Sequence, residues 1–209
     1  FYHQYDTVTG EKIYHNKDMD FSRSLHAVMG YEKALNKGLN LKTEVYYQYL
    51  YNIPVTIEPS SFSLINMGSG FSRFYPEPLE NTGSGYNYGL EITLQKYFSK
   101  SFFFLLSGTI YDSKYYGSDG TLRNTSYNGA YIANTLAGKE FKLGEKQPIG
   151  VGLKITFAGG KRYGYVDVEK SAELIEIIYL DEGFNDRQFY DYFRADVKIS
   201  WKFNAKRAT

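Results

Sequence analysis

The amino-acid sequence predicts an all-β fold, an antiparallel up-and-down sheet of long strands that forms part of a transmembrane β-barrel. Three observations lead to this prediction. First, about seven segments resemble strands of 11 to 16 residues, whereas strands of globular proteins usually have about five or six. Second, their connections alternate between tight turns and long loops. Third, apolar and polar side chains alternate with period two in most segments, as a wall between lipid and water requires.

The connections are sorted by length along the chain. Tight links are expected near Asn36-Lys37-Gly38, near Ser99-Lys100 and over Leu143–Pro148. Long loops are expected over Asp6–Arg23, Asn52–Gly85, Lys114–Tyr127 and Arg162–Asp191. Barrels of the bacterial outer membrane have short periplasmic turns and long extracellular loops. A soluble barrel has no reason to sort its loops by side, so the pattern indicates a membrane.

The first four expected strands differ in how strictly they alternate. Leu25–Leu35 follows the rule loosely. Leu39–Tyr51 places Leu, Val and Tyr mainly at odd positions, and Tyr86–Lys96 separates Tyr, Leu and Ile from Asn, Glu, Thr and Gln. Phe102–Tyr111 begins with five apolar residues in a row. One face of this strand is therefore expected to meet lipid, and the other something buried in the lumen.

The last three expected strands repeat the pattern. Tyr131–Phe141 alternates loosely, Ile149–Phe157 cleanly and Phe193–Phe203 most cleanly, with Phe, Ala, Val, Ile and Trp opposite Arg, Asp, Lys and Ser. At about 3.3 Å per residue and a tilt of about 45°, strands of this length cover the hydrocarbon core of a bilayer.

A soluble β-sandwich or lipocalin-like barrel is the alternative, since its strands also alternate. Its packed interior would not accommodate the charges on the polar faces, which are Lys42, Glu44, Arg194, Asp196, Lys198 and Lys202. The chain also has 22 Tyr and 15 Phe, more than a small core needs. Several lie near strand ends, as in the aromatic girdles of membrane barrels: Tyr47, Tyr49, Tyr51, Tyr86, Tyr88, Trp201 and Phe203.

Composition excludes several classes of protein. A net charge of +1 and a pI near 7.9 give no electrostatic basis for binding nucleic acid. A mean hydropathy of −0.44, without a long apolar run, excludes a transmembrane helix. The absence of cysteine excludes disulfides and thiolate metal sites.

No enzymatic, cofactor or metal site is expected. His3, His15 and His26 are the three histidines, and they are interpreted as solvated polar residues rather than as a metal site. Gly159-Gly160-Lys161 lacks the spacing of a phosphate loop and is interpreted as a kink or bulge at a strand end. Glu91 and Asp196 are expected to face the lumen, where cross-strand ion pairing is favoured over contact with a plug or a translocation path.

Substrate specificity is expected in the long loops. Asn52–Gly85 is rich in proline and aromatic residues, whose rings would stack on a sugar, a chelate or a peptide, or fix the loop to its neighbours. Ser171–Leu180 is apolar for a loop, and Leu174, Ile177 and Ile178 predict a short amphipathic helix, packed on adjacent loops in preference to a partner lipoprotein. The candidate substrate residues are Phe71, Phe74, Tyr75, Tyr163 and Tyr179.

Particular motifs resemble one family. The run Gly85-Tyr86-Asn87-Tyr88-Gly89-Leu90-Glu91-Ile92-Thr93-Leu94 resembles a barrel strand of TonB-dependent outer-membrane receptors. Five further segments are similar to motifs of this family: Leu50–Val55, Tyr111–Thr125, Gly138–Phe141, Ala158–Tyr163 and Asp191–Asp196. Together they cover most of the chain, in the order found in the C-terminal half of the family's barrel.

The resemblance implies energised import through the outer membrane of a Gram-negative cell. Such receptors form barrels of about 22 strands plugged by an N-terminal domain. They bind scarce substrates with their extracellular loops, and TonB pulls on an N-terminal box to open them. Residues 1–209 are expected to be one part of such a C-terminal barrel, without the plug, the TonB box and the final strands. Phe1–Tyr5 is expected to end a preceding strand, since an odd-stranded open sheet leaves unpaired edges in lipid.

Two other functions remain open. A passive porin-like channel would lack a plug and would have a constricting loop folded inwards. A surface adhesin or assembly subunit would use its barrel only to anchor the loops. The expected partners are outer-membrane lipid, the TonB complex, a surface lipoprotein, and a small-molecule, metal-chelate, glycan or peptide substrate.

Overall fold

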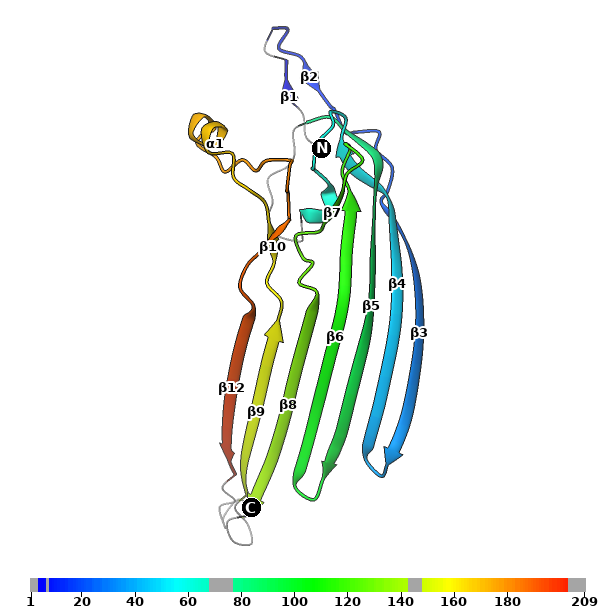
Figure 1. The fold of residues 1–209 in the computed structure, drawn as a ribbon, viewed down its shortest axis with the longest axis vertical. Coiled ribbons are helices and arrows are strands. Elements are labelled where there is room, and N and C mark those ends of the chain that lie inside the picture. Colours follow the sequence, from blue (N-terminus) through cyan, green and yellow to red (C-terminus); the bar gives the residue numbers. More distant parts are fainter. Residues whose placement is uncertain (1–3, 7, 68–76, 143–147, 203–209) are drawn as a thin grey trace, which may run out of the picture.

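The computed structural model describes residues 4–6, 8–67, 77–142 and 148–202, which form mainly β-strands in one curved sheet (Figure 1). The long strands are β3 Arg23–Asn36, β4 Leu39–Thr56, β5 Leu79–Ser99, β6 Phe102–Tyr116, β8 Tyr131–Lys142, β9 Pro148–Ala158 and β12 Tyr192–Trp201. Each pairs antiparallel with the next one along the chain, and the short strand β7, Leu122–Asn124, pairs with β6. The predicted all-β, up-and-down architecture is therefore confirmed. Within the described residues the sheet is open, with β3 and β12 as its edges.

The connections are sorted by side as predicted. Tight turns lie at one end of the sheet and long connections at the other (Figure 1). The β3–β4 turn uses Gly38 at φ +88°, and the β5–β6 turn uses Lys100 and Ser101, both with positive φ. Two positive-φ residues define the type I′ turn, whose twist matches that of the flanking strands. The predicted link over Leu143–Pro148 lies mostly outside the described residues.

The pairing register keeps the faces of all long strands in phase. One row across five strands consists of Met29, Val45, Leu90, Ile110 and Tyr131. On the opposite face, rows consist of His26, Gln48, Asn87 and Ser113, and of Asn134, Thr156 and Arg194. A slip of one residue would move every side chain of a strand to the other face. The register therefore gives the sheet one continuous apolar face and one polar face.

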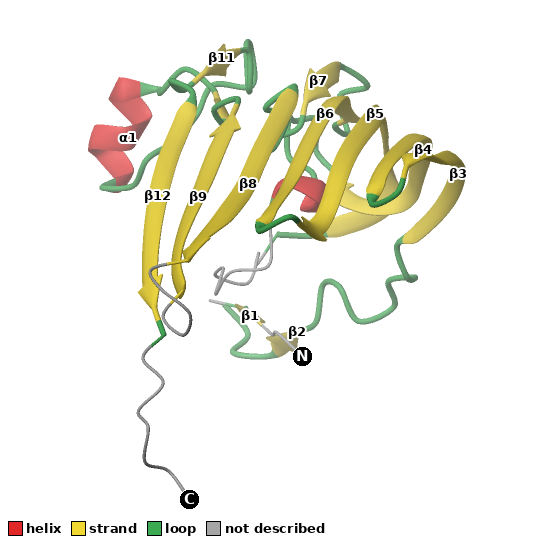
Figure 2. Cartoon of the chain, turned by 90° about the horizontal axis from the view of Figure 1, so that it is seen from below, coloured by secondary structure: helices red, strands yellow, loops and turns green. Residues whose placement is uncertain are grey.

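The polar face is the concave one. Seen along the strands, the 3-10 helix η1, Leu64–Asn66, lies inside the curve of the sheet (Figure 2). Ile65 of η1 packs over Gly85, where a Cβ would lie 2.8 Å from Ile65 Cδ1. Gly85 belongs to the polar face of β5, since it precedes Tyr86 and is in phase with Asn87. The apolar face is therefore convex.

The wall has almost no buried interior of its own. The molecule exposes 15332 Å², against roughly 9,900 Å² expected for a folded soluble monomer of this mass. The buried apolar side chains are Ile53, Val55 and Tyr115, all at the long-loop end of the sheet. The rest of the sheet depends on its backbone hydrogen bonds and on whatever medium covers its two faces.

The strands extend further into the predicted loops than expected. The loop predicted over Asn52–Gly85 is shortened at both ends, because β4 continues to Thr56 and β5 begins at Leu79. A bulge allows this extension: the register shifts between Leu50 and Ile53, and Asn52 takes φ +54°. β6 likewise continues to Tyr116. Sequence alternation ends before the strands do, because the bulge breaks the period while pairing continues.

Short elements occupy the long connections. Gln4–Tyr5 (β1) pairs with Lys12–Ile13 (β2) in a separate hairpin, and the assignment of Phe1–Tyr5 to the end of a preceding strand stays a prediction. In the β9–β12 connection, Arg162–Tyr163 (β10) pairs with Arg187–Gln188 (β11).

The predicted helix is displaced. α1 spans Val168–Leu174 and ends at Ile175, which takes the left-handed conformation at φ 55°. Leu174 lies in the helix, but Ile177 and Ile178 follow it, so their assignment to the helix is wrong. The helix has no buried residues, so the expected packing on adjacent loops is not seen either. The described residues contain no helix that is long and apolar enough to span a membrane.

Candidate functional site

The convex face carries an apolar band bounded by polar rows. At its upper limit, toward the long loops, Tyr88 donates a hydrogen bond to Asp112 (3.1 Å), and Lys114 pairs with Asp112 at 3.4 Å. At its lower limit Lys96 donates to Ser99 Oγ (2.7 Å) near the tight turn. From Tyr88 to Lys96 the strand is about 26 Å long, which at a tilt of about 40° corresponds to a height of about 20 Å, somewhat less than the lipid-facing band of about 25 Å in membrane barrels.

Tyrosines concentrate near the upper limit of the band. Tyr86 stacks beside Tyr88 and Tyr49 beside Tyr51, with ring centroids 6.2 and 5.8 Å apart. Tyr47 lies directly opposite Tyr88 on the same face. This position matches the predicted aromatic girdle, where apolar rings with polar tips suit a boundary between lipid and water.

A row of neutral polar side chains crosses the concave face below the loops. Gln48 donates to Ser24 Oγ (3.0 Å), and Asn87 donates to Gln48 Oε1 (2.7 Å). Ser113 donates to Asn87 Oδ1 and shares a hydrogen bond of 2.7 Å with Thr125. We call this set, Ser24, Gln48, Asn87, Ser113 and Thr125, the amide row.

Two tyrosines lie along the wall directly below the amide row. Tyr46 lies over Gly89, where a Cβ would be 2.7 Å from its hydroxyl oxygen. Gly89 is paired with Tyr111, whose hydroxyl donates to Tyr127 O (3.1 Å) and accepts from Gly129 N (3.2 Å). Both side chains therefore reach sideways along the sheet. We call Tyr46 and Tyr111 the tyrosine platform.

Carboxylates lie one row lower. Glu44 and Glu91 are directly opposite each other on β4 and β5, and Lys42 pairs with Glu44 at 2.6 Å. We call Glu44 and Glu91 the carboxylate row. Asp196 forms its ion pair with Arg194, two residues away in the same strand at 2.9 Å, and also lies directly opposite Lys154 of β9. Glu91 lies opposite another glutamate on β4, and no ion pair of Glu91 is found among the described residues.

The apolar start of β6 has a local explanation. Phe103 points to the concave face and covers Gly138, and its ring lies 6.3 Å from that of Phe98. Phe98 reaches this face through a register shift between Lys96 and Ser99. The concave face of this strand was expected to meet something buried in the lumen. The neighbours of Phe103 there, Phe98 and Gly138, belong instead to the wall itself.

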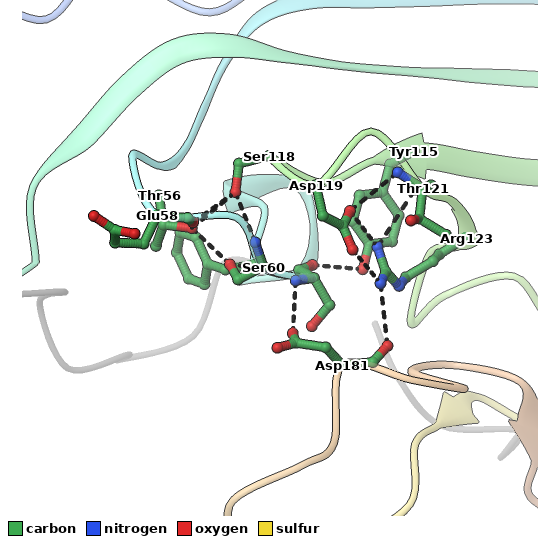
Figure 3. A network of polar contacts seen from close by, with 11 residues as sticks. Thr56, Glu58, Ser60, Tyr115, Ser118, Asp119, Thr121, Arg123 and Asp181 are labelled. Carbon is green, nitrogen blue, oxygen red and sulfur yellow. Dashed lines mark hydrogen bonds and ion pairs between the residues drawn. The ribbon is translucent and has the colours of Figure 1, made fainter.

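Three long connections interlock above the wall in a polar network (Figure 3). We call residues 57–67, 117–130 and 159–191 the loop cap. Tyr115 of β6, fully buried, donates to Ser61 O (2.8 Å), and Ser118 accepts from Ser60 N (2.9 Å). Asp181 accepts from Ser61 N (2.6 Å), which joins the third connection to the first.

A charged pair lies at the centre of the loop cap. Arg123, whose side chain is 7% exposed, binds both carboxylate oxygens of Asp119, at 2.8 and 2.6 Å, and donates to Asp181 O at 3.1 Å. The Arg123 hydrogen bond holds the pKa of Asp119 below its usual value, against the effect of burial. The same bond raises the pKa of Arg123. This bidentate geometry gives a charge-assisted contact between strand β7 and its neighbours.

Glycines let the cap connections cross closely. A Cβ at Gly159 would lie 1.7 Å from Gly129 O, and one at Gly160 would lie 2.1 Å from Phe189 O. Nearby, the buried Asn185 donates to Asn124 O (2.8 Å), and Arg162 donates to Asn128 O (3.0 Å). β9 ends at Ala158, directly before Gly159, so the strand ends at the predicted position. At that point the backbone of Gly159 crosses the backbone of Gly129.

A hollow of about 420 Å³ opens between two connections of the loop cap. Asp119, Arg123, Asp181, Glu182 and Asp186 line it. Asp119 and Asp181 already accept hydrogen bonds from Arg123 and Ser61. Within the described residues no group of three or more His, Asp or Glu is placed to hold a metal ion.

The structure describes two of the five predicted substrate residues, Tyr163 and Tyr179. Phe71, Phe74 and Tyr75 lie outside the described residues. Tyr163 packs on Phe189 with ring centroids 4.3 Å apart, and Tyr179 meets the edge of Phe184 at 6.0 Å. Each therefore has a ring of its own connection as its neighbour, and their role in substrate binding stays a prediction.

The tyrosine platform on the concave face was not predicted from the sequence. Tyr46 and Tyr111 were not singled out, although they are aromatic residues at positions of the polar face. The available signal was a large ring that interrupts an otherwise polar face. Both tyrosines are such rings, and both are paired with Gly89 of the neighbouring strand. Comparisons with protein-family models, curated protein sequences and solved structures found no match to this chain.

Proposed function

We propose that this chain forms part of the wall of a transmembrane β-barrel in the outer membrane of a Gram-negative cell. The in-phase register is the observation that carries the proposal. It produces a continuous apolar convex face beside a polar concave face. A soluble protein would cover such an apolar face, since contiguous exposed patches on monomers rarely exceed a few hundred Å².

Within that class, we propose a TonB-dependent receptor that imports a scarce substrate. The ordered family-like motifs support this proposal, and two of their glycines have specific roles here. Gly85 accommodates Ile65 of the loop cap, and Gly89 accommodates Tyr46 of the tyrosine platform. The first glycine allows the loop cap to contact the wall, and the second allows Tyr46 to lie flat along the wall and not across the lumen. An import barrel needs both.

A passive porin-like channel is the second candidate, and one observation favours it. Residues 57–67 fold onto the concave face, as a constricting loop would. However, their contacts with Gly85 and Tyr115 lie at the long-loop end. The concave wall at the level of Glu91 has no covering segment within the described residues, so this loop narrows the mouth and not the middle.

Two measurements test the proposal. The native protein, isolated from outer membranes, should require detergent, migrate differently before and after boiling, and have a mass well above 24.0 kDa. Uptake of its substrate by cells should stop when a protonophore removes the energy that TonB transmits. A protein that dissolves without detergent would contradict the barrel, whereas uptake that continues with the protonophore would identify the passive channel.

A further inference from the structure

The tyrosine platform has hydrogen-bonding groups on both sides. The pairing places Gln48, Asn87 and Ser113 two residues above Tyr46, Gly89 and Tyr111, and Glu44 and Glu91 two residues below them. Residues two apart on one face of a strand are about 6.6 Å apart along it. The three rows therefore span about 13 Å, the length of two to three sugar rings.

The platform presents flat apolar surface toward the lumen. Because Gly89 has no side chain, the Tyr46 ring lies over the backbone of β5 and stays half-buried on the concave face. Tyr111 is held sideways by its two hydrogen bonds to residues 127 and 129. Neither ring needs to reorient to be stacked upon, which reduces the entropic cost of binding.

The amide row keeps hydrogen-bonding capacity free. Each amide NH₂ group has two protons. Gln48 uses one toward Ser24, and Asn87 uses one toward Gln48. The bonds among the described residues leave the second proton of each amide available. Bonds within the row also fix the orientation of both amides, as a site that recognises hydroxyl groups requires.

The charges around the platform disfavour anions. Glu32, Glu44 and Glu91 lie on the concave face near a single lysine, Lys42. Lys42 is already paired with Glu44. An anionic ligand would meet net negative charge in a confined space, whereas hydroxyl groups donate favourably to carboxylates.

We infer that the concave wall at Tyr46 and Tyr111 binds a neutral oligosaccharide during its passage through the barrel. Sugar rings present apolar C–H faces that stack on the tyrosines and equatorial hydroxyls that bond to the amide and carboxylate rows. This inference rests on the proposed import function and names the substrate class of that function.

The test uses the full-length protein, purified in detergent, and neutral hexasaccharides of the glucan, mannan, galactan and xylan series. Binding is measured by calorimetry and by saturation-transfer NMR. Tyr46→Ala should weaken the binding of the preferred series about tenfold, because it removes the stacking surface. Gln48→Met should weaken it about fivefold through the loss of the amide. Tyr46→Phe, which keeps the ring, should bind nearly as the wild type does.

Tyr47→Ala is the matched control. Tyr47 is the next residue of the same strand, but it faces the convex side, so its loss should leave sugar binding unchanged. Equal effects of Tyr46→Ala and Tyr47→Ala would overturn the inference. Binding of a ferric chelate or a peptide, or of none of the probes, in place of the hexasaccharides would also overturn it.

Membrane insertion is recorded for every variant by its outer-membrane fractionation and heat-modifiable mobility. A wild-type protein that fails this check contradicts the proposed function itself. A correctly inserted barrel that ignores neutral sugars contradicts only the assignment of the substrate.

Discussion

The wall and the loop cap are built in opposite ways. In the wall, side chains alternate with period two and few of them are buried, and long runs of backbone pairing provide the order. In the loop cap, there is no such period, and buried polar groups such as Arg123, Thr125, Asn128 and Asn185 are held by hydrogen bonds to neighbouring segments. The wall therefore depends on its surroundings, whereas the cap is held by its own contacts.

The largest expected effect tests the dependence of the wall on lipid. Leu106→Lys places a charge on the convex face, opposite Leu94. It should reduce the free energy of unfolding in lipid vesicles by about 2 to 4 kcal/mol, as for a lysine near the bilayer midplane. Urea titration of the protein in vesicles measures this. Ser107→Lys, one residue away on the concave face, should change it by less than about 1 kcal/mol. Similar losses in both variants would show that the two faces do not meet different media.

The next effect tests the cap. Arg123→Leu leaves Asp119 without its partner and removes the contact with Asp181 O. It should destabilise the cap locally by about 2 kcal/mol, because charged hydrogen bonds at a buried site are lost. Faster proteolysis within residues 117–130, with unchanged urea unfolding of the wall, is the expected result. Arg194→Leu breaks an exposed pair and should cost less than about 1 kcal/mol. Loss of wall stability in Arg123→Leu would contradict the separation of the two regions.

A smaller effect comes from a single neutral hydrogen bond. Tyr115→Phe removes the donor to Ser61 O and should cost about 1 kcal/mol, seen as faster hydrogen exchange in residues 57–67. Tyr116→Phe is its control, because Tyr116 is the next residue of β6 and is 38% exposed. Equal exchange in the two variants would mean that this bond does not hold the first connection to the wall.

The smallest effect is a dependence on pH. The pKa of Asp119 is lowered in the folded cap, so its stabilising contribution is complete above the usual aspartate pKa of 3.8 and declines as the pH falls below it, through the folded pKa. Pepsin cleavage within the cap should therefore accelerate below that pH. Asp119→Asn should reduce this acceleration, since it no longer titrates. An unchanged pH profile in Asp119→Asn would assign the acid sensitivity to another group.

The wall could be predicted from the sequence because its environment changes only across the sheet. Val45 and Tyr46 lie on opposite faces of the sheet, and the alternation of apolar and polar residues along the strand indicates which face each one occupies. The pairing of β4 with β5 beyond Asn52 could not be predicted. Asn52 takes a left-handed conformation that breaks the alternation of side chains, while the backbone hydrogen bonds between the two strands continue. Cross-strand ion pairs were expected for Glu91 and Asp196, whereas the ion pairs formed are Lys42–Glu44 and Arg194–Asp196, each within one strand, because side-chain reach is not encoded in the spacing.

The loop cap was beyond sequence reasoning for a different reason. Arg123, Asp119 and Asp181 come from distant parts of the chain, and their meeting depends on where Gly129 and Gly159 let the connections cross. The Ser171–Leu180 segment shows the same limit, because its apolar spacing predicts a helix across Ile175, where the backbone turns left-handed. The tyrosine platform depends on Tyr46 lying over a glycine of another strand, which only the register reveals.

The shared register has a consequence for how such a chain tolerates insertions and deletions during evolution. A single residue added to the Lys100–Ser101 turn would move the side chains of β6 to the opposite face, so changes there must come in even numbers or be lost. The long connections have enough slack to absorb an odd change before the next strand begins. New recognition surfaces would then arise at one end of the molecule, while the opposite end keeps its length.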